Sequence, residues 1–302
     1  MSTPAPIPAP VRTLRRFGRG RSTVEAGEAN WLVRLVLFAI CVLWMVPALG
    51  LLVTSLRSPD DASTSGWWTA IFNPFSESWS FGNYTDVLNE GMDTAFLNSL
   101  IVTLPATLIP ITIAAFAAYA FTFMRFPGRE VFFVMCVALL VVPLQIALIP
   151  LLKLFGEFDL NGTFLAVWLV HAGFGLPLAI YTLRNYMATL PNEVIESAKV
   201  DGASHFTTFW RLVVPMAIPA IAAFTIFQFL WTWNDLLVAL VFIGAGDNQV
   251  VTVKLAGLVG QFGQDWHLLT AGAFISMALP LLVFFALQRF FVRGLTAGAV
   301  KG

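Results

Sequence analysis

The chain has 302 residues, of which 58% are hydrophobic and only 11% are charged, and its 17 basic and 17 acidic residues give a net charge of zero. Soluble domains carry roughly 25% charged residues, so this chain has too few charged side chains to cover the surface of a soluble protein of its size. The composition excludes a disordered chain, a collagen-like fibre and a disulfide scaffold, and the zero net charge gives no basic surface for nucleic acid. A multi-pass protein of the lipid bilayer is the class that remains.

Six long stretches of the chain lack Lys, Arg, Asp and Glu, apart from Asp235 in the fifth. Each is long enough to cross a bilayer as a helix, which takes about 20 apolar residues. We therefore expect an all-α polytopic membrane protein with six transmembrane helices. The expected spans are residues 35–56, 94–124, 131–152, 160–183, 212–243 and 268–288.

The remaining segments follow from these spans. The Pro- and Arg-rich residues 1–30 are expected to be a disordered cytoplasmic segment. Residues 31–302 are expected to be the transmembrane domain, with a first outer loop over residues 57–93. A cleaved signal peptide is disfavoured, because the first apolar run is too long and lacks a clear cleavage site.

The distribution of basic residues predicts the orientation. If the N-terminus lies inside, only three of the 17 Lys and Arg residues fall in outer segments, namely Arg57, Lys153 and Lys254, and the other 14 fall in inner ones. Cytoplasmic loops carry an excess of Lys and Arg in membrane proteins. Both termini are therefore expected in the cytoplasm.

Chemistry that would make the chain a self-contained enzyme is absent from the sequence. No lysine follows a phosphate-binding glycine loop, and no G-x-S-x-G or H-E-x-x-H occurs. The three histidines, His171, His205 and His267, lie in separate segments without metal-ligand spacing. We expect no catalytic residue and no metal site. Because the spans offer only His171 and Asp235 as ionisable groups, ion coupling also has little to act through, and the energy for any transport would come from another polypeptide.

The cytoplasmic loop between the fourth and fifth spans, residues 184–211, is the most informative segment. Pro191 suits the first turn of a helix, and Gly202 permits a turn that residues with a Cβ resist. Two short helices joined at this glycine would make a rigid knob. The loop carries the spacing E-x-A-x-x-D-G-A, whose fixed positions are Glu196, Ala198, Asp201, Gly202 and Ala203.

That layout resembles the EAA loop of bacterial ABC-importer permeases. The family pattern is roughly E-A-A, three residues, a glycine, nine residues and I-x-L-P. These positions are occupied here by Glu196-Ser197-Ala198, Gly202 and Leu212-Val213-Val214-Pro215, with Ser for Ala, Leu for Ile and Val for Leu. The resemblance implies that the knob docks in a groove of an ATPase subunit, where Glu196 and Asp201 would pair with basic groups.

Two further segments resemble those of carbohydrate importers. Residues 288–302 are similar to the tail of MalG-like permease subunits, in which G-L-T-x-G-x-V-K-G recurs. That tail reaches toward the ATPase dimer interface in the family, and the residues implied here are Gly294, Gly298 and Lys301. Trp233-Asn234-Asp235 looks like the W-N-[DE] of sugar permeases. The candidate residues of the substrate pathway are Trp231, Trp233, Asn234 and Asp235.

The resemblance implies a whole assembly around the chain. It would be one of two different permease subunits with the type I importer fold, in a bacterial or archaeal inner membrane. Two copies of an ATPase subunit would bind ATP and Mg, so this chain would hold no cofactor itself. An extracytoplasmic sugar-binding protein would deliver the solute and contact the loop over residues 244–267.

Several alternatives stay open at this point. Asp235 either has a partner or a cavity inside the span, or lies near enough to the outer surface to be solvated. Asn234 is a candidate for contact with sugar hydroxyls, and Trp231 or Trp233 for stacking. The favoured solute is an α-glucoside or another oligosaccharide. A permease of the same fold for glycerol phosphate or a polyamine, or a self-sufficient secondary transporter, would be the competing functions.

Overall fold

The structure, a computed structural model, describes residues 31–259 and 265–299, with side chains as far as Gln288. The expected disordered segment 1–30 and the tail residue Lys301 lie outside the described residues, and Gly294 and Gly298 lie beyond the described side chains. The chain divides into two compact units, Met1–Pro47 and Ala48–Gly302.

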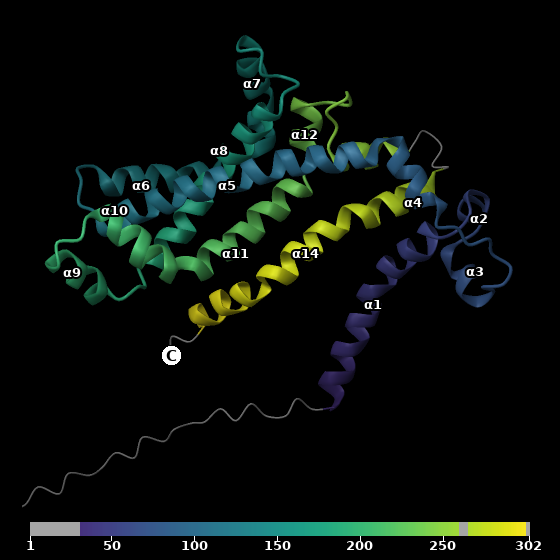
Figure 1. The fold of residues 1–302 in the computed structure, drawn as a ribbon, viewed down its shortest axis with the longest axis horizontal. Coiled ribbons are helices and arrows are strands. Elements are labelled where there is room, and N and C mark those ends of the chain that lie inside the picture. Colours follow the sequence, from purple (N-terminus) through teal and green to yellow (C-terminus); the bar gives the residue numbers. More distant parts are fainter. Residues whose placement is uncertain (1–30, 260–264, 300–302) are drawn as a thin grey trace, which may run out of the picture. The chain divides into compact units, whose positions relative to one another are not determined.

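Helices and the turns between them make up the described residues, without any β-strand (Figure 1). In chain order the helices are α1 (Trp31–Ser55), α2 (Pro59–Thr64), α3 (Trp67–Phe72), α4 (Gly82–Val87), α5 (Asp93–Phe123), α6 (Arg129–Ala138), α7 (Leu144–Glu157), α8 (Phe164–Met187), α9 (Asn192–Val200), α10 (His205–Thr208), α11 (Val214–Trp233), α12 (Leu237–Phe242), α13 (Val251–Leu258) and α14 (Trp266–Ala299). Short segments of altered helical pitch are η1 (Leu88–Met92), η2 (Leu139–Val141) and η3 (Phe209–Val213).

Five helical runs of the described residues are long and apolar enough to cross a membrane, or six if the bent pair α6–η2 and α7 counts as one span. The other five are α1, the run from α4 through α5, α8, the run from α10 through α11, and α14. The expectation of an all-α polytopic membrane protein is therefore confirmed.

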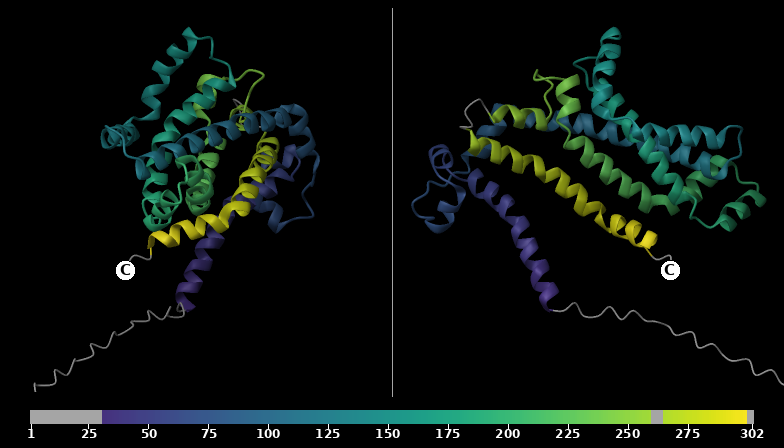
Figure 2. Two further views of the ribbon diagram at one scale, coloured as in Figure 1. Left: turned by 60° about the vertical axis from the view of Figure 1, so that its left-hand side comes forward. Right: turned by 180° about the vertical axis from the view of Figure 1, so that it is seen from behind.

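The core of the second unit is a packed set of long helices. The helix α5 lies against α8 and α11, and α11 lies against α14 (Figures 1 and 2). Small residues face these contacts, including the fully buried Ala106, Ala114 and Ala118 of α5. At Gly175 of α8 a Cβ would meet the side chain of Gln228 at 2.5 Å, so glycine is needed for this close approach of α8 and α11. Small residues at helix interfaces are the usual way in which membrane helices approach closely.

The third expected span, a single helix over residues 131–152, is wrong. The chain there forms α6 and α7, which meet at an angle of 101°. Pro143 lies at the bend, and Val142 before it has extended dihedral angles. Proline cannot donate an N–H and disfavours the helical region for the preceding residue, so the helix stops here.

The fifth expected span also differs from the structure. One helix over residues 212–243 was expected, but α11 ends at Trp233 and α12 begins at Leu237. The loop expected over residues 184–211 is shorter, because α8 continues to Met187 and helix resumes at His205. Stretches without charged residues indicate which part of the chain lies in the hydrocarbon core of the membrane. They do not give the helix bounds, because a helix can extend beyond this core or break within it.

The outer segment between α1 and α4 is held by a buried ion pair that sequence reasoning missed. The Nε of Arg57 lies 2.7 Å from Oε2 of Glu77, and both side chains are almost fully buried. Arg57 also donates to the Ser65 carbonyl at 3.0 Å and to the Ser65 hydroxyl, while the Thr69 hydroxyl donates to Oε1 of Glu77 at 3.0 Å. Beside this pair, hydrogen bonds from the Ser78 N–H and from the Ser58 hydroxyl hold the pKa of the Asp61 carboxyl below its usual value.

Replacing Glu77 by alanine is expected to unfold this outer segment. The change leaves the Arg57 charge buried without its partner, which costs about 3–5 kcal/mol. Glu157→Ala, at an exposed acid of α7, is the control and should change stability by less than about 0.5 kcal/mol. Limited proteolysis of the purified protein checks this, and equal cleavage rates for the two variants would show that the pair does not anchor the segment.

Candidate functional site

The loop that carries the EAA-like spacing forms a compact knob between α8 and α11. Its helix α9 buries Ile195 and Ala198, and Ile195 packs in the cluster that contains Met187, Phe209 and Val213. These contacts fix α9 to the ends of α8 and α11. The opposite face of α9 is exposed, including Glu196.

A glycine with a left-handed backbone ends α9. Gly202 has a φ of +76°, and its N–H donates to the Lys199 carbonyl at 3.1 Å. The N–H of Ala203 donates to the Ala198 carbonyl at 2.9 Å. This pair of bonds is a Schellman motif, which satisfies the last carbonyls of a helix and favours glycine at this position. The sequence-based prediction of a turn at Gly202 is confirmed.

The second half of the knob is joined to α5 by a side-chain contact. The hydroxyl of Tyr119 and Nδ1 of His205 share a hydrogen bond of 3.0 Å. Ser204 caps α10, because its hydroxyl accepts the Thr207 N–H at 3.2 Å. The knob is therefore attached at both ends, to the core cluster through Ile195 and to α5 through His205. Of the fixed positions of the motif, Glu196 and Ala198 lie on α9, and Asp201, Gly202 and Ala203 form the turn that follows it.

The candidate residues of the substrate pathway lie where α11 ends. Oδ2 of Asp235 accepts the Ala239 N–H at 3.1 Å, and the Asp235 carbonyl accepts the Thr252 hydroxyl at 2.6 Å. Oδ2 also lies 3.6 Å from Nε2 of His171 on α8, a distance too long for a direct hydrogen bond. The Asp235 carboxylate is thus next to the first turn of α12 and to a buried imidazole, and it has a partner inside the protein.

The three neighbours of Asp235 differ in what they can do. Trp233 is buried, its Nε1 donates to the Ser276 carbonyl at 3.2 Å, and its ring stacks on Phe229. Trp231 meets the His171 ring edge to face at 5.0 Å between centroids. Asn234 is exposed, and its amide donates to the Leu230 carbonyl at 2.8 Å, which closes the end of α11. In this conformation Trp233 packs the core and presents no free face to a solute.

One buried polar residue of this region was not identified as important from the sequence. Gln228, a fully buried amide of α11, donates to the carbonyl of Ala106 on α5 at 3.2 Å and to that of His171 on α8 at 3.3 Å. It therefore ties three spans together. A polar residue within an apolar span was the only available hint, and it did not reveal the partners.

Two cavities of very different size lie near these residues. The one beside Asp235, His171 and Thr232 measures about 10 Å³, which holds one water molecule at most. A second of about 350 Å³ opens at the outer end and has polar lining residues, among them Glu90, Thr94, Asp247, Gln249 and Lys254. Small-molecule sites measure about 300–1,000 Å³, so of these two cavities the outer pocket is the one large enough for a solute.

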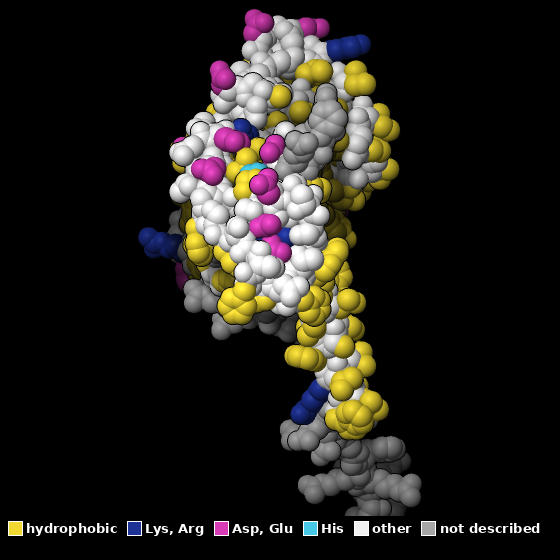
Figure 3. Space-filling model, turned by 90° about the vertical axis from the view of Figure 1, so that its right-hand side faces the viewer, with side chains coloured by type: hydrophobic (Ala, Val, Ile, Leu, Met, Phe, Trp, Pro, Cys, Tyr) yellow, Lys and Arg dark blue, Asp and Glu magenta, His cyan; other side chains and the backbone are white. Residues whose placement is uncertain are grey.

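The outer end is also acidic. Figure 3 shows acidic side chains gathered on the face formed by the outer segment. Exposed acids of this part of the chain are Asp60, Asp86, Glu90 and Asp93. A negative potential at this end of the molecule would repel anions and favour neutral or cationic solutes.

A family model described as "Binding-protein-dependent transport system inner membrane component" matches residues 110–297. The osmoprotective compounds uptake permease protein GgtD of Synechocystis sp. is 56% identical over 89% of this chain and 91% of its own length. The alpha-glucoside transport system permease protein AglG of Rhizobium meliloti is 42% identical over 90% of this chain and 97% of its own length.

The fold has a counterpart among solved structures. One chain of a bacterial alginate ABC transporter, crystallised in complex with an alginate pentasaccharide-bound periplasmic protein, superposes with a TM-score of 0.60. The alignment covers 87% of this chain and 95% of that chain at 13% sequence identity. A likeness at this identity concerns the fold, and it confirms the type I importer architecture expected from the sequence.

Proposed function

Because the chain belongs to the family of binding-protein-dependent transport system inner-membrane components, we propose that it is the permease subunit of an ATP-driven sugar importer. Members of this family are multi-pass proteins of the inner membrane and are the non-catalytic part of their transporters. The observation that carries the proposal is the likeness to the two permeases at 56% and 42% identity over about nine-tenths of the chain.

The proposed solute is an α-glucoside or a similar small polyhydroxylated compound. The activities for which the two relatives are named, uptake of alpha-glucosides and of osmoprotective compounds, support this class. The outer pocket offers carboxylate, amide, hydroxyl and ammonium groups, which suit sugar hydroxyls. Glycerol phosphate is disfavoured by the acidic outer end. A polyamine is the second candidate, since the same acids would attract a cation.

The proposed assembly contains a second, different permease subunit, two copies of an ATPase and an extracytoplasmic binding protein. ATP and Mg would be bound by the ATPase, and both termini of this chain would lie in the cytoplasm. The knob around α9 would dock in the ATPase. Its buried anchors, its exposed Glu196 and its rigid ends support a role in transmitting movement to the spans.

Uptake by the complete transporter in proteoliposomes tests the proposal. We expect ATP-dependent import of at least one of maltose, sucrose and trehalose when the binding protein is present, and no import of glycerol 3-phosphate. Import of putrescine alone would replace the sugar with the second candidate. Import by this chain without any ATPase would show a secondary transporter instead.

Glu196→Lys is expected to weaken ATPase binding more than Glu196→Ala does. Loss of a charge-assisted contact costs about 1.5–3 kcal/mol when the contact is partly desolvated, and reversal adds repulsion from a basic groove. Copurification of the ATPase, normalised to membrane abundance, measures the effect. Glu193→Lys is the matched control, because Glu193 is an exposed acid of α9 outside the fixed positions of the motif. Equal retention of the ATPase by Glu196→Lys and wild type would make Glu196 a solvated charge only.

A further inference from the structure

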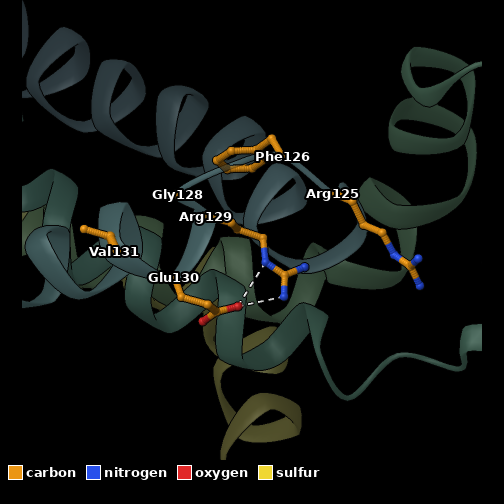
Figure 4. Close-up of a pocket in the computed structure, with 6 residues that line it drawn as sticks. All are labelled: Arg125, Phe126, Gly128, Arg129, Glu130 and Val131. Atoms are coloured by element: carbon orange, nitrogen blue, oxygen red, sulfur yellow. Dashed lines mark hydrogen bonds and ion pairs between the residues drawn. The ribbon is translucent and has the colours of Figure 1, made fainter.

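The connection between α5 and α6 contains a basic pocket that the transport role does not use. It measures about 500 Å³ and is lined by Arg125, Phe126, Gly128, Arg129, Glu130 and Val131 (Figure 4). Gly128 has a φ of +78°, so the chain turns sharply before α6 begins at Arg129. This turn leaves the side chains of both arginines at the same pocket.

The two arginines differ in how their charges are satisfied. Nε and Nη2 of Arg129 both donate to Oε1 of Glu130, at 3.0 and 2.7 Å, and Nη1 donates to the Met124 carbonyl at 3.2 Å. Arg125 is exposed, and it has no ion pair or side-chain hydrogen bond with any described residue. With two guanidinium groups and one carboxylate, the pocket carries one net positive charge.

Apolar side chains begin where the basic pocket ends. Val131, Phe132, Val134 and Met135 of α6 are each half or more exposed. Val131 itself lines the pocket, and the other three follow it along the first turns of α6. A positively charged recess next to an exposed apolar helix face is complementary to an amphiphile with an anionic head group.

We propose that this pocket binds the phosphate of an anionic phospholipid of the inner leaflet. One phosphodiester charge balances the net charge of the pocket, and Arg125 supplies the uncommitted guanidinium, the group best suited to paired hydrogen bonds with phosphate oxygens. An acyl chain would lie along the exposed face of α6. The inner-leaflet assignment rests on the cytoplasmic orientation contained in the proposed function, and basic pockets between membrane helices on that side suit lipid head groups.

The apolar face favours a lipid over dissolved phosphate. Inorganic phosphate shares the head-group chemistry and would be held by the arginines, but it would leave Val131 and Phe132 without a partner. A lipid satisfies the charge and covers the apolar side chains with one molecule. A variant of Phe132 therefore reports on the lipid and not on the phosphate.

Lipid retention by the purified complete transporter tests the proposal. The complex is reconstituted in equal parts of phosphatidylglycerol and phosphatidylcholine, extracted with mild detergent, and analysed for bound lipid by mass spectrometry. We expect enrichment of phosphatidylglycerol in the wild type and a fall in that enrichment of about fivefold in Arg125→Gln. Arg34→Gln, at an exposed arginine of α1, is the matched control and should retain the wild-type ratio. Phe132→Gln should also lower the enrichment.

Three outcomes would overturn the lipid site. The first is the same lipid ratio in Arg125→Gln as in wild type. A second permease subunit that covered α6 in the complex would give this result, because the lipid would have no access to the pocket. The second is loss of phosphatidylglycerol in millimolar phosphate but not in chloride of equal ionic strength, which would assign the pocket to free phosphate. The third is an unchanged ratio in Phe132→Gln. None of these measurements uses transport, so a failed sugar-uptake assay would refute the proposed function and leave the lipid result standing.

Discussion

Replacing Gly202 by valine is expected to lower solute import about tenfold or more while the permease reaches the membrane in normal amounts. The φ of +76° at Gly202 lies in a region where a residue with a Cβ costs about 1–2 kcal/mol, and a β-branched residue is a strong outlier there. Apart from Gly202 and its two chain neighbours, no atom of the described residues lies within 4 Å of the position that a Cβ would occupy, so the strain comes from the backbone. The valine would break the Schellman bonds of α9 and move its exposed face, and a shift of 1.4 kcal/mol in docking is a factor of about ten.

Gly202→Asn is the matched control for this experiment. Asparagine tolerates the left-handed conformation, so it keeps the turn while adding a side chain of similar bulk. Import and ATPase copurification should stay near the wild-type level in Gly202→Asn and fall in Gly202→Val. If both variants import normally, the turn is not a coupling element. If both fall equally, bulk on the knob surface matters and the backbone conformation does not.

This position also shows which features a sequence can reveal. The turn at Gly202 was predictable because it depends on local chemistry, a glycine after a short helix. The six apolar stretches were predictable for the same reason, since a bilayer selects composition over a fixed length. The bend at Pro143 had a local cause as well, but proline is so common in membrane helices that it did not distinguish a kink from a right-angled break.

Contacts between distant segments could not be predicted. Arg57 read as one of three outer basic residues, although it is buried against Glu77. Gln228 read as a polar residue in a span, although it joins α5 and α8. Each pairing depends on which helices lie side by side, and a single sequence contains that information only through the fold.

Breaking the contact between Asp235 and His171 is expected to have the second large effect. Asp235→Leu removes the group that accepts the Ala239 N–H and that faces Nε2 of His171. Each buried polar group left without a partner costs about 1–3 kcal/mol. The break between α11 and α12 should therefore loosen, with a lower unfolding temperature of the purified complex and reduced import.

A double-mutant cycle measures the interaction between these two side chains directly. Removing both partners, as in His171→Leu with Asp235→Leu, should recover part of the stability lost in Asp235→Leu, because the double variant no longer buries a polar imidazole against leucine. We expect a coupling energy of about 0.5–3 kcal/mol between the two positions. Asn234→Leu, at the exposed neighbouring residue, controls for added bulk at the helix break.

The cycle also decides between the two roles of Asp235 that the sequence left open. A carboxylate solvated near the outer surface would tolerate leucine. The stability effects of replacing Asp235 and of replacing His171 would then be additive. A carboxylate that holds α8 against the break between α11 and α12 would show coupling in stability and a matching loss of import. Additive effects in the purified complex would contradict the contact as a determinant of the break, even if import fell, and would leave Asp235 acting on the solute alone.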